Sequence, residues 1–303
     1  MRARRAALDW IDGYGDRDGD GYVEYETRNP DSGLVNQCWK DSWNSILFSD
    51  GRLARAPIAT CEIQGYVYDA KRRAARLARS VWHDEALAGR LTAEADELRG
   101  RFHDDFWIPD RAFFALALDG DKRQVDSLTS NIGHLLWSGI VRTDHAEAVV
   151  RHLMGDALYS GWGVRTMAVG DAGYSPIEYH NGTVWPHDNS LIAAGLRRYG
   201  FHEETARIAA TMVRAAPYFD YRLPEVFAGF PAEMTHAPVE YPTASRPQAW
   251  AAGAPLLALT SVLGMSPGAD GPKCDPHLPD EFGDVVLRGV RGHWGRADVA
   301  APA

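Results

Sequence analysis

The chain has 303 residues, of which 45% are hydrophobic and 24% are charged, a composition typical of a folded globular protein with a large core. Its formal net charge is −9, from 41 acidic and 32 basic residues. No Lys/Arg-rich run alternates with aromatic residues as a nucleic-acid groove would require, so we expect no nucleic-acid partner.

The sequence predicts neither a membrane segment nor a targeting signal. The uncharged stretch Pro247–Ala269 is interrupted by glycines and prolines, which leaves an apolar helix too short to cross a bilayer. The N-terminal sequence MRARRAALDW is basic but lacks the long apolar region of a signal peptide. Three scattered cysteines, Cys38, Cys61 and Cys274, predict neither a disulfide framework nor a zinc site. We therefore expect a cytoplasmic protein without a membrane partner.

Helical periodicity dominates the chain. Apolar residues recur at three- and four-residue spacing in nine stretches, which predict eight or nine helices. In chain order these are Ala6–Tyr14, Ser42–Phe48, Glu62–Trp82, Glu85–Phe102, Gln124–Trp137, His145–Met154, Val184–Tyr199, His202–Ala216 and Gln248–Leu263.

Strand signals are few. Phe106–Ile108 and Phe113–Leu118, joined by a turn at Pro109–Asp110, predict a hairpin, and Asp284–Arg288 predicts a short strand near the C-terminus. Strands and helices do not alternate as they do in a doubly wound sheet. The sequence therefore predicts an all-α fold.

Three long connections are rich in Gly, Pro, Asp and aromatic residues: Gly15–Lys40, Tyr159–Thr183 and Pro217–Pro247. Loops of this length in a compact domain are usually functional. The chain also contains ten Trp residues, and although most such rings fill cores, they also stack on sugars and bases. We expect a helical scaffold whose active face is built from loops.

The first of these loops contains a candidate calcium site. Asp16, Asp18 and Asp20, followed by Gly21, begin like an EF-hand loop, and carboxylate oxygens suit a hard cation. The twelfth position holds Thr27 instead of the bidentate Glu. The alternative is an Asp/Gly-rich turn whose side chains bond to their own backbone.

Two carboxylates are candidates for acid–base chemistry. Asp41 stands between Trp39 and Trp43, and an apolar wall there would raise the pKa of the carboxyl, as a general acid needs. The alternative is that Asp41 caps a following helix. Glu225 follows Pro224 in an apolar segment, which suits a carboxylate held in one position. Glycoside hydrolysis requires such a pair on opposite sides of the scissile bond.

The middle loop has the mixture of side chains that binds hydroxyl-rich ligands. The segments SGWGVRT, residues 160–166, and YHNGTVWPHDN, residues 179–189, combine aromatic faces with polar groups. His180 and His187 are seven residues apart with Pro186 between them, which is not a usual metal-ligand spacing. Asp188 is as well explained by a structural role, as a helix cap or a core hydrogen-bonding group, as by a role in ligand binding. Signatures of dinucleotide-binding, P-loop, HExxH and GxSxG enzymes are missing.

Seven short blocks, in order, resemble the glycogen-debranching, amylo-α-1,6-glucosidase-type family of six-hairpin glycosidases, which have an (α/α)6 barrel. The resemblance extends from about residue 7 to residue 265. The blocks are NQCWKDSW (36–43), EIQGY (62–66), SNIGH (130–134), SGWGVRT (160–166), YHNGTVWPHDN (179–189), LPEVFAG (223–229) and PQAWAA (247–252).

The resemblance implies an inverting hydrolase of α-linked glucosyl groups, with an α-glucan or a small α-glucoside as substrate and no required cofactor. Asp41 would be the general acid and Glu225 the general base. The residues that would line the sugar subsite are Trp39, Lys40, Gln64, Trp162, Trp185, His187 and Trp250.

This chain departs from the family pattern at Cys38, where Gly is usual, and at Asn44, where Asp is frequent. Family members also carry a β-rich N-terminal domain and further barrel helices before the region matched here. The resemblance therefore implies an incomplete (α/α)6 toroid over residues 1–265, a tail over residues 266–303, and self-association or a partner chain at the open face. Two alternatives are a sugar-binding pseudoenzyme and a sugar epimerase on the same toroid, although epimerases depend on His pairs.

Overall fold

The computed structural model of this chain describes residues 2–29 and 31–302. Most of these residues lie in helices and in the loops that join them. The α-helices are α1 (Arg2–Trp10), α2 (Cys61–Leu77), α3 (Glu85–Phe106), α4 (Asn131–Ser138), α5 (Thr143–Met154), α6 (Pro186–Arg198), α7 (His202–Ala215) and α8 (Ala249–Val262). Short helical turns are η1 (Ile11–Gly15), η2 (Ala78–Trp82), η3 (Ala216–Phe219) and η4 (Asp280–Phe282).

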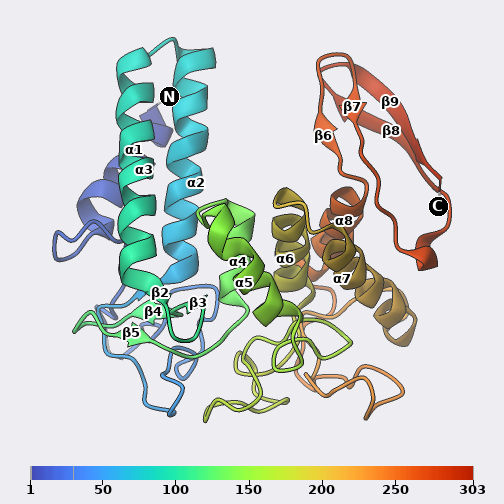
Figure 1. Ribbon diagram of the computed structural model, residues 1–303, viewed down its shortest axis with the longest axis horizontal. Coiled ribbons are helices and arrows are strands. Elements are labelled where there is room, and N and C mark those ends of the chain that lie inside the picture. Colours follow the sequence, from blue (N-terminus) through green and yellow to red (C-terminus); the bar gives the residue numbers. More distant parts are fainter. Residues whose placement is uncertain (1, 30, 303) are drawn as a thin grey trace.

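The helices are arranged in two rows. In the inner row α2 packs on α4, α4 on α6 and α6 on α8, while the outer helices α3, α5 and α7 each pack on the inner helix before them in the chain. Figure 1 shows these helices side by side, with the long connecting loops gathered at one end. Successive helical hairpins with an inner and an outer row form the (α/α)6 toroid, so the expected all-α fold class is confirmed.

Glycines set the close spacing of the inner row. A Cβ atom on Gly133 of α4 would lie 2.5 Å from Cγ1 of Ile192 on α6. A Cβ atom on Gly195 of α6 would lie 2.6 Å from the backbone nitrogen of Trp137 on α4. Because a side chain at either position would force the two helices apart, Gly133 allows the Ile192 side chain to pack on the α4 backbone, and Gly195 allows the backbone of α6 to approach that of α4.

One large apolar core joins the hairpins. The rings of Phe102 and Phe106 on α3 stack at 4.6 Å, and Phe102 also stacks on Phe114 at 5.2 Å. This core continues through Leu135 of α4 to Ile192 of α6, all completely buried. Burial of these side chains, worth about 1.5–3 kcal/mol each, fixes the scaffold on which the loops stand.

The structure confirms most of the predicted helices, and it corrects two. Residues 42–48 form turns and no helix, because the Ser45 hydroxyl donates to the carbonyls of Lys40 and Ser42 and the Asn36 amide also donates to Ser42. Side chains thus take the carbonyls that a helix would use. The stretch 124–137 begins as a strand, and its helix starts only at Asn131.

The strands are short. They are β1 (Ala59–Thr60), β2 (Trp107–Ile108), β3 (Phe113–Phe114), β4 (Ala117–Leu118), β5 (Gln124–Val125), β6 (Ser266–Pro267), β7 (Pro272–Lys273), β8 (Val285–Gly292) and β9 (Gly295–Ala301). The predicted hairpin is present as the antiparallel pair β2–β3, with Phe106 ending α3 instead of starting a strand. The predicted strand Phe113–Leu118 is divided, because β4 leaves β3 and pairs with β1 and β5.

After α8 the chain forms an arm of two hairpins, β6–β7 and β8–β9, that stands apart from the loop end of the helices (Figure 1). The predicted strand Asp284–Arg288 is confirmed and extended, since β8 runs to Gly292. Among the described residues, no helix combines the length and the apolar character needed to cross a membrane.

Candidate active site

Three loops far apart in the sequence meet through backbone pairing. Val184 pairs with Arg165 on one side and with Phe227 on the other, and the amides and carbonyls of Val184 and Phe227 exchange hydrogen bonds of 2.9 and 3.0 Å. Trp185 directly follows Val184, and Glu225 stands two residues before Phe227. This pairing therefore fixes Glu225 beside the aromatic segment that opens α6.

The Asp41 loop is tied to the same segment by side chains. The Ser42 hydroxyl lies 2.7 Å from Nδ1 of His180, and the Asn44 amide donates to Glu178 at 3.0 Å. The Asn181 amide returns a hydrogen bond of 3.0 Å to the Asn44 carbonyl. The Asn44 position, at which this chain departs from the family pattern, thus holds the loop that presents Asp41.

Tyr179 connects the two predicted catalytic carboxylates. Burial raises the pKa of Tyr179, and the interaction of its phenol with the Glu225 carboxyl and the charges of Glu225 and Asp41 raise it further. Both carboxyls therefore act electrostatically on this phenol. The structure brings together two side chains that are 184 positions apart in the sequence.

The two carboxyls have different surroundings. Glu225 is partly buried, and the Ser245 backbone N–H donates to its Oε2 at 3.2 Å. Asp41 is exposed, and Trp43 projects into solvent with 66% of its surface exposed. The prediction that two indole rings enclose Asp41 is therefore wrong, because only Trp39 turns towards the interior. Asp41 is also no helix cap, since turns follow it.

An aromatic cluster forms around Trp39. Its ring contacts four others, those of His134, His180, Trp185 and His187, at centroid distances between 5.1 and 5.8 Å. His187 also contacts Trp250 at 4.2 Å. Four of the predicted sugar-binding residues, Trp39, Trp185, His187 and Trp250, thus come together. Trp250 is 48% exposed and lies at the open edge of the cluster.

Two histidines of this cluster, His180 and His187, are neutral at physiological pH. Burial lowers the pKa of His180 to about 3, with further contributions from Lys40 and His187. Burial likewise lowers the pKa of His187 to about 4. Neutral rings can donate and accept hydrogen bonds without repelling a cationic transition state.

A buried polar network lies beneath Trp39. His134 connects the Tyr66 hydroxyl, at 2.5 Å, to the Asp188 carboxylate, at 2.7 Å. Lys40 is completely buried, its ammonium donates to the Thr166 carbonyl at 2.5 Å, and burial lowers its pKa to about 8. The resemblance implies a contact between Lys40 and the sugar; the structure places it below the cluster, where its charge faces Asp188.

Buried polar atoms without a partner among the described residues concentrate at this site. They include Nε1 of Trp39, Nε2 of His180 and Oδ2 of Asp188, together with atoms of Asn44, Asn181, Glu62 and Asn131. Buried polar groups in folded proteins are normally hydrogen-bonded. The site therefore offers donors and acceptors to a polar, hydroxyl-rich ligand.

Two predicted subsite residues lie outside the cluster. The side-chain amide of Gln64 exchanges hydrogen bonds with the backbone of Val23 and donates to the Thr60 carbonyl, at 2.8 to 3.1 Å. The side chain is completely buried. Trp162 donates to the Thr235 hydroxyl at 3.0 Å and contacts Tyr218. The residues that the sequence interpretation missed are Tyr179, His134 and Tyr66, although each falls within a block that carried the resemblance.

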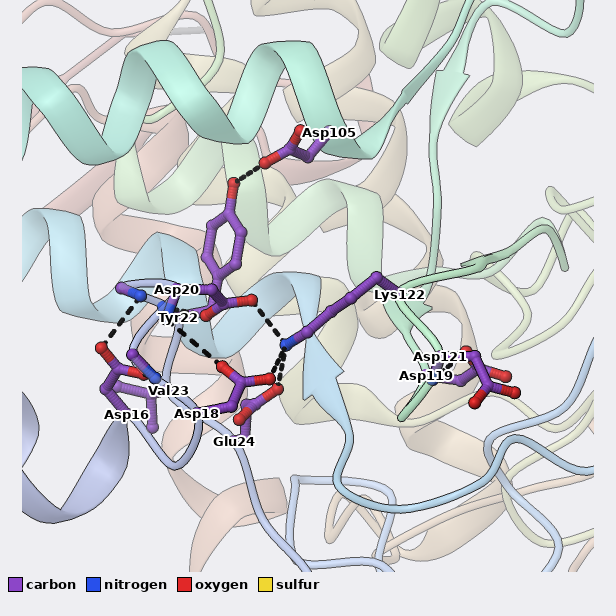
Figure 2. Close-up of polar contacts among 12 residues, drawn as sticks. Asp16, Asp18, Asp20, Tyr22, Val23, Glu24, Asp105, Asp119, Asp121 and Lys122 are labelled. Atoms are coloured by element: carbon purple, nitrogen blue, oxygen red, sulfur yellow. Dashed lines mark hydrogen bonds and ion pairs between the residues drawn. The ribbon is translucent and has the colours of Figure 1, made fainter.

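Two groups of side chains have metal-ligand composition, Asp16 with Asp18 and Asp20, and His202 with Asp275 and His277. A basic side chain already bonds to each group. Lys122 pairs with the first group, as Figure 2 shows, and Arg197 donates to the second. Neither group adjoins the Trp39 cluster in the contacts of the described residues.

One known protein family matches most of the chain. Residues 14–229 match the mannosylglycerate hydrolase MGH1-like glycoside hydrolase domain, a range that contains both Asp41 and Glu225. A search of curated protein sequences finds no match. The expected six-hairpin superfamily is confirmed, and the family shown within it is the MGH1-like one.

Solved structures show the same fold at low sequence identity. Neutral trehalase Nth1 from Saccharomyces cerevisiae has a TM-score of 0.54 at 15% identity, over 73% of this chain and 41% of the trehalase. The GH63 mannosylglycerate hydrolase from Thermus thermophilus in complex with glucose has 0.55 at 18%, over 67% and 48%. A sialidase has 0.72 at 15%, over 98% and 28%. The chain spans less than half the length of each.

Proposed function

Because the chain belongs to the MGH1-like glycoside hydrolase family, within the six-hairpin glycosidases, we propose that it is an inverting glycoside hydrolase with Asp41 as general acid and Glu225 as general base. The observation that carries this proposal is that the loops of Asp41 and Glu225 meet at residues 179–185: Ser42 contacts His180, Val184 pairs with Phe227, and both carboxyls act on the Tyr179 phenol. In an inverting enzyme the two carboxyls stand roughly 6.5–9.5 Å apart, with room for a water molecule between base and sugar.

In the proposed reaction, Asp41 gives its proton to the glycosidic oxygen as the bond between that oxygen and the anomeric carbon breaks. Glu225 takes a proton from the water that attacks the opposite face of the sugar. The exposed position of Asp41 suits an acid that protonates a leaving group on the solvent side. The backbone contact from Ser245 and the phenol of Tyr179 hold the base in one orientation.

The sugar ring would lie against the aromatic cluster. Trp250, at the open edge, offers a face for the C–H surface of the sugar, while the unpartnered Nε1 of Trp39 and Nε2 of His180 offer hydrogen bonds to its hydroxyls. Lys40 and the His134–Asp188 pair would act from below by fixing Trp39.

For the substrate, we propose a small α-linked glycoside. The matched family and the Thermus protein are both named for mannosylglycerate hydrolysis, which favours a sugar joined to a short organic acid. The resemblance of seven blocks to the debranching family favours α-1,6-linked glucosides as the second class to assay. A sugar-binding protein without hydrolytic activity is the competing function.

The test combines product stereochemistry with two carboxamide variants. Incubation with mannosylglycerate, trehalose and isomaltose, followed by proton NMR, should show a product of inverted anomeric configuration from at least one substrate. Asp41→Asn and Glu225→Gln should each lower kcat by about 10²–10⁴-fold, whereas Asp104→Asn, an exposed change on α3, should not. Retention of configuration, or full activity of Asp41→Asn, would refute the assignment. Sugar binding without turnover by the parent chain would favour the competing function.

A further inference from the structure

The loop from Asp16 to Glu24 folds back on itself through hydrogen bonds to its own backbone. The Asp16 carboxylate accepts the backbone N–H groups of Gly19, at 2.7 Å, and of Gly21, at 2.9 Å. Gly21 adopts a φ of +84°, a left-handed conformation that glycine takes without steric cost. These bonds use both oxygens of Asp16. Asp18 and Asp20 each keep one oxygen that points away from these bonds.

The ammonium group of Lys122 lies among the remaining oxygens. Its Nζ is 2.7 Å from Oδ2 of Asp18, 2.5 Å from Oδ2 of Asp20 and 2.5 Å from Oε1 of Glu24. Figure 2 shows the lysine side chain extending from its turn to these three carboxylates. The ammonium donates a hydrogen bond to Glu24 and forms ion pairs with Asp18 and Asp20, so its charge is shared among three carboxylates.

Burial makes this contact essential for the loop. The side chain of Glu24 is completely shielded from solvent, and an unpaired carboxylate there would be strongly destabilising. Burial tends to lower the pKa of Lys122, but its hydrogen bonds to the three carboxyls outweigh that effect and raise the pKa above its usual value. Lys122 therefore stays charged at any physiological pH.

The turn between β4 and β5 is built to present Lys122. The residue has a φ of +60°, which is unfavourable for a side chain other than glycine or asparagine. Its N–H donates to the Asp119 carbonyl at 2.8 Å, and the Asp119 carboxylate accepts the N–H groups of Asp121 and Arg123, each at 3.0 Å. The turn thus holds the lysine in a conformation that an isolated chain would avoid.

A divalent ion does not fit while the ammonium is in place. Calcium needs several oxygen ligands at about 2.3–2.6 Å, and the oxygens of Asp18, Asp20 and Glu24 already bond to a positive charge. We infer that Lys122 is the built-in cation of this loop, taking the position that a calcium ion would occupy, and that removing its charge converts the loop into a divalent-cation site. The carboxylates of Asp18, Asp20 and Glu24 would then face no positive charge from residue 122.

This ammonium clamp, Lys122 with Asp18, Asp20 and Glu24, supports the proposed acid loop. Tyr25 follows Glu24 and donates its hydroxyl to Asn36 at 2.8 Å. The Asn36 amide in turn donates to the carbonyls of Ser42, at 2.7 Å, and Trp43, at 3.3 Å, directly after Asp41. The clamp therefore lies at one end of a hydrogen-bonded chain that ends beside Asp41.

The experiment uses binding and unfolding rather than catalysis, so its outcome is independent of the proposed function. The wild-type chain should show no terbium luminescence sensitised by Tyr22, and its Tm should be the same in millimolar calcium and in EDTA. Lys122→Met should unfold several degrees lower in EDTA, recover much of that loss in calcium, and give terbium luminescence. Lys273→Met, an exposed change in β7, is the matched control and should behave like the wild type.

Two results would overturn the inference. One is calcium binding by the wild-type chain that raises its Tm and is lost in Asp18→Asn. The other is a folded Lys122→Met whose Tm is unchanged and insensitive to calcium. If Lys122→Met folds only when calcium is present, the inference is supported. If it folds in neither condition, two further measurements test the inference: the calcium titration of the wild-type chain and the Tm of the charge-conserving Lys122→Arg. We expect Lys122→Arg to remain insensitive to calcium.

Discussion

The phenol of Tyr179 interacts with the carboxyl of Glu225, which helps to raise the pKa of Tyr179. The same ring contacts Trp185 at 4.8 Å, so one residue joins the proposed base to the aromatic cluster. A phenol that stays protonated can only donate to a carboxylate, and the raised pKa of Tyr179 keeps it protonated across the physiological range. Tyr179 is therefore a positioning residue for Glu225.

Removal of this hydroxyl should slow the reaction without unfolding the protein. Tyr179→Phe keeps the ring contact with Trp185 but removes the hydroxyl that interacts with Glu225, and a polar contact to a charged group is worth about 1.5–3 kcal/mol. We expect kcat to fall at least ~10-fold with KM and Tm little changed. Tyr218→Phe, which removes an exposed hydroxyl bonded to the His236 carbonyl, is the control in the same assay. Equal kcat values for the two variants would contradict the positioning role.

Local sequence predicted the helices well because their apolar spacing is itself the cause of their packing. It failed where a side chain competes with the backbone: the spacing in Ser42–Phe48 suits a helix, yet Ser45 and Asn36 take the carbonyls. Local sequence also could not predict which residues distant along the chain pair in the fold. The apolar neighbours of Glu225 showed that it is held, but only the Val184–Phe227 pairing shows where.

The same limit applies to the calcium site, which stays a prediction. The spacing of Asp16, Asp18 and Asp20 does indicate a cation, and the structure shows three carboxylates, those of Asp18, Asp20 and Glu24, around one positive charge. The charge belongs to Lys122, which lies about a hundred positions further along the chain. No local pattern distinguishes a loop that binds a metal ion from one whose carboxylates pair with a lysine of another turn.

Acid should weaken the fold through His180. Its folded-state pKa of about 3 lies below the ordinary value of 6.5, so the unfolded chain binds more protons and stability falls as the pH drops from about 6.5 towards 3. Urea unfolding between pH 7 and pH 4 should show a loss of about 1 kcal/mol per unit below pH 6 from this residue. His180→Asn should have a shallower slope by that amount, whereas exposed His236→Asn should not. Parallel slopes for both variants would refute the assignment.

Trp250 should contribute to substrate binding more than to stability. Its ring is 48% exposed and contacts His187 at the open edge of the cluster. A stacked aromatic face contributes about 0.5–1.5 kcal/mol, so Trp250→Ala should raise KM by about 2- to 12-fold and lower Tm only slightly. The control is Trp10→Ala, which removes a 53% exposed indole on α1. If both variants leave KM unchanged, Trp250 does not contact the sugar.

The spacing of the inner helices gives a stability prediction that does not depend on the function. In Gly133→Ala the new methyl group would meet Ile192 at 2.5 Å, so α4 and α6 must separate or strain, at a cost of about 1–3 kcal/mol. Gly89→Ala on the exposed side of α3 meets no atom within 4 Å and should instead stabilise the protein by up to ~1 kcal/mol, because alanine favours a helix more than glycine does. Chemical unfolding of the two variants should move the midpoint in opposite directions. A stabilised Gly133→Ala would show that the Ile192 side chain does not pack on the α4 backbone, and the close-packed inner row would then be wrong.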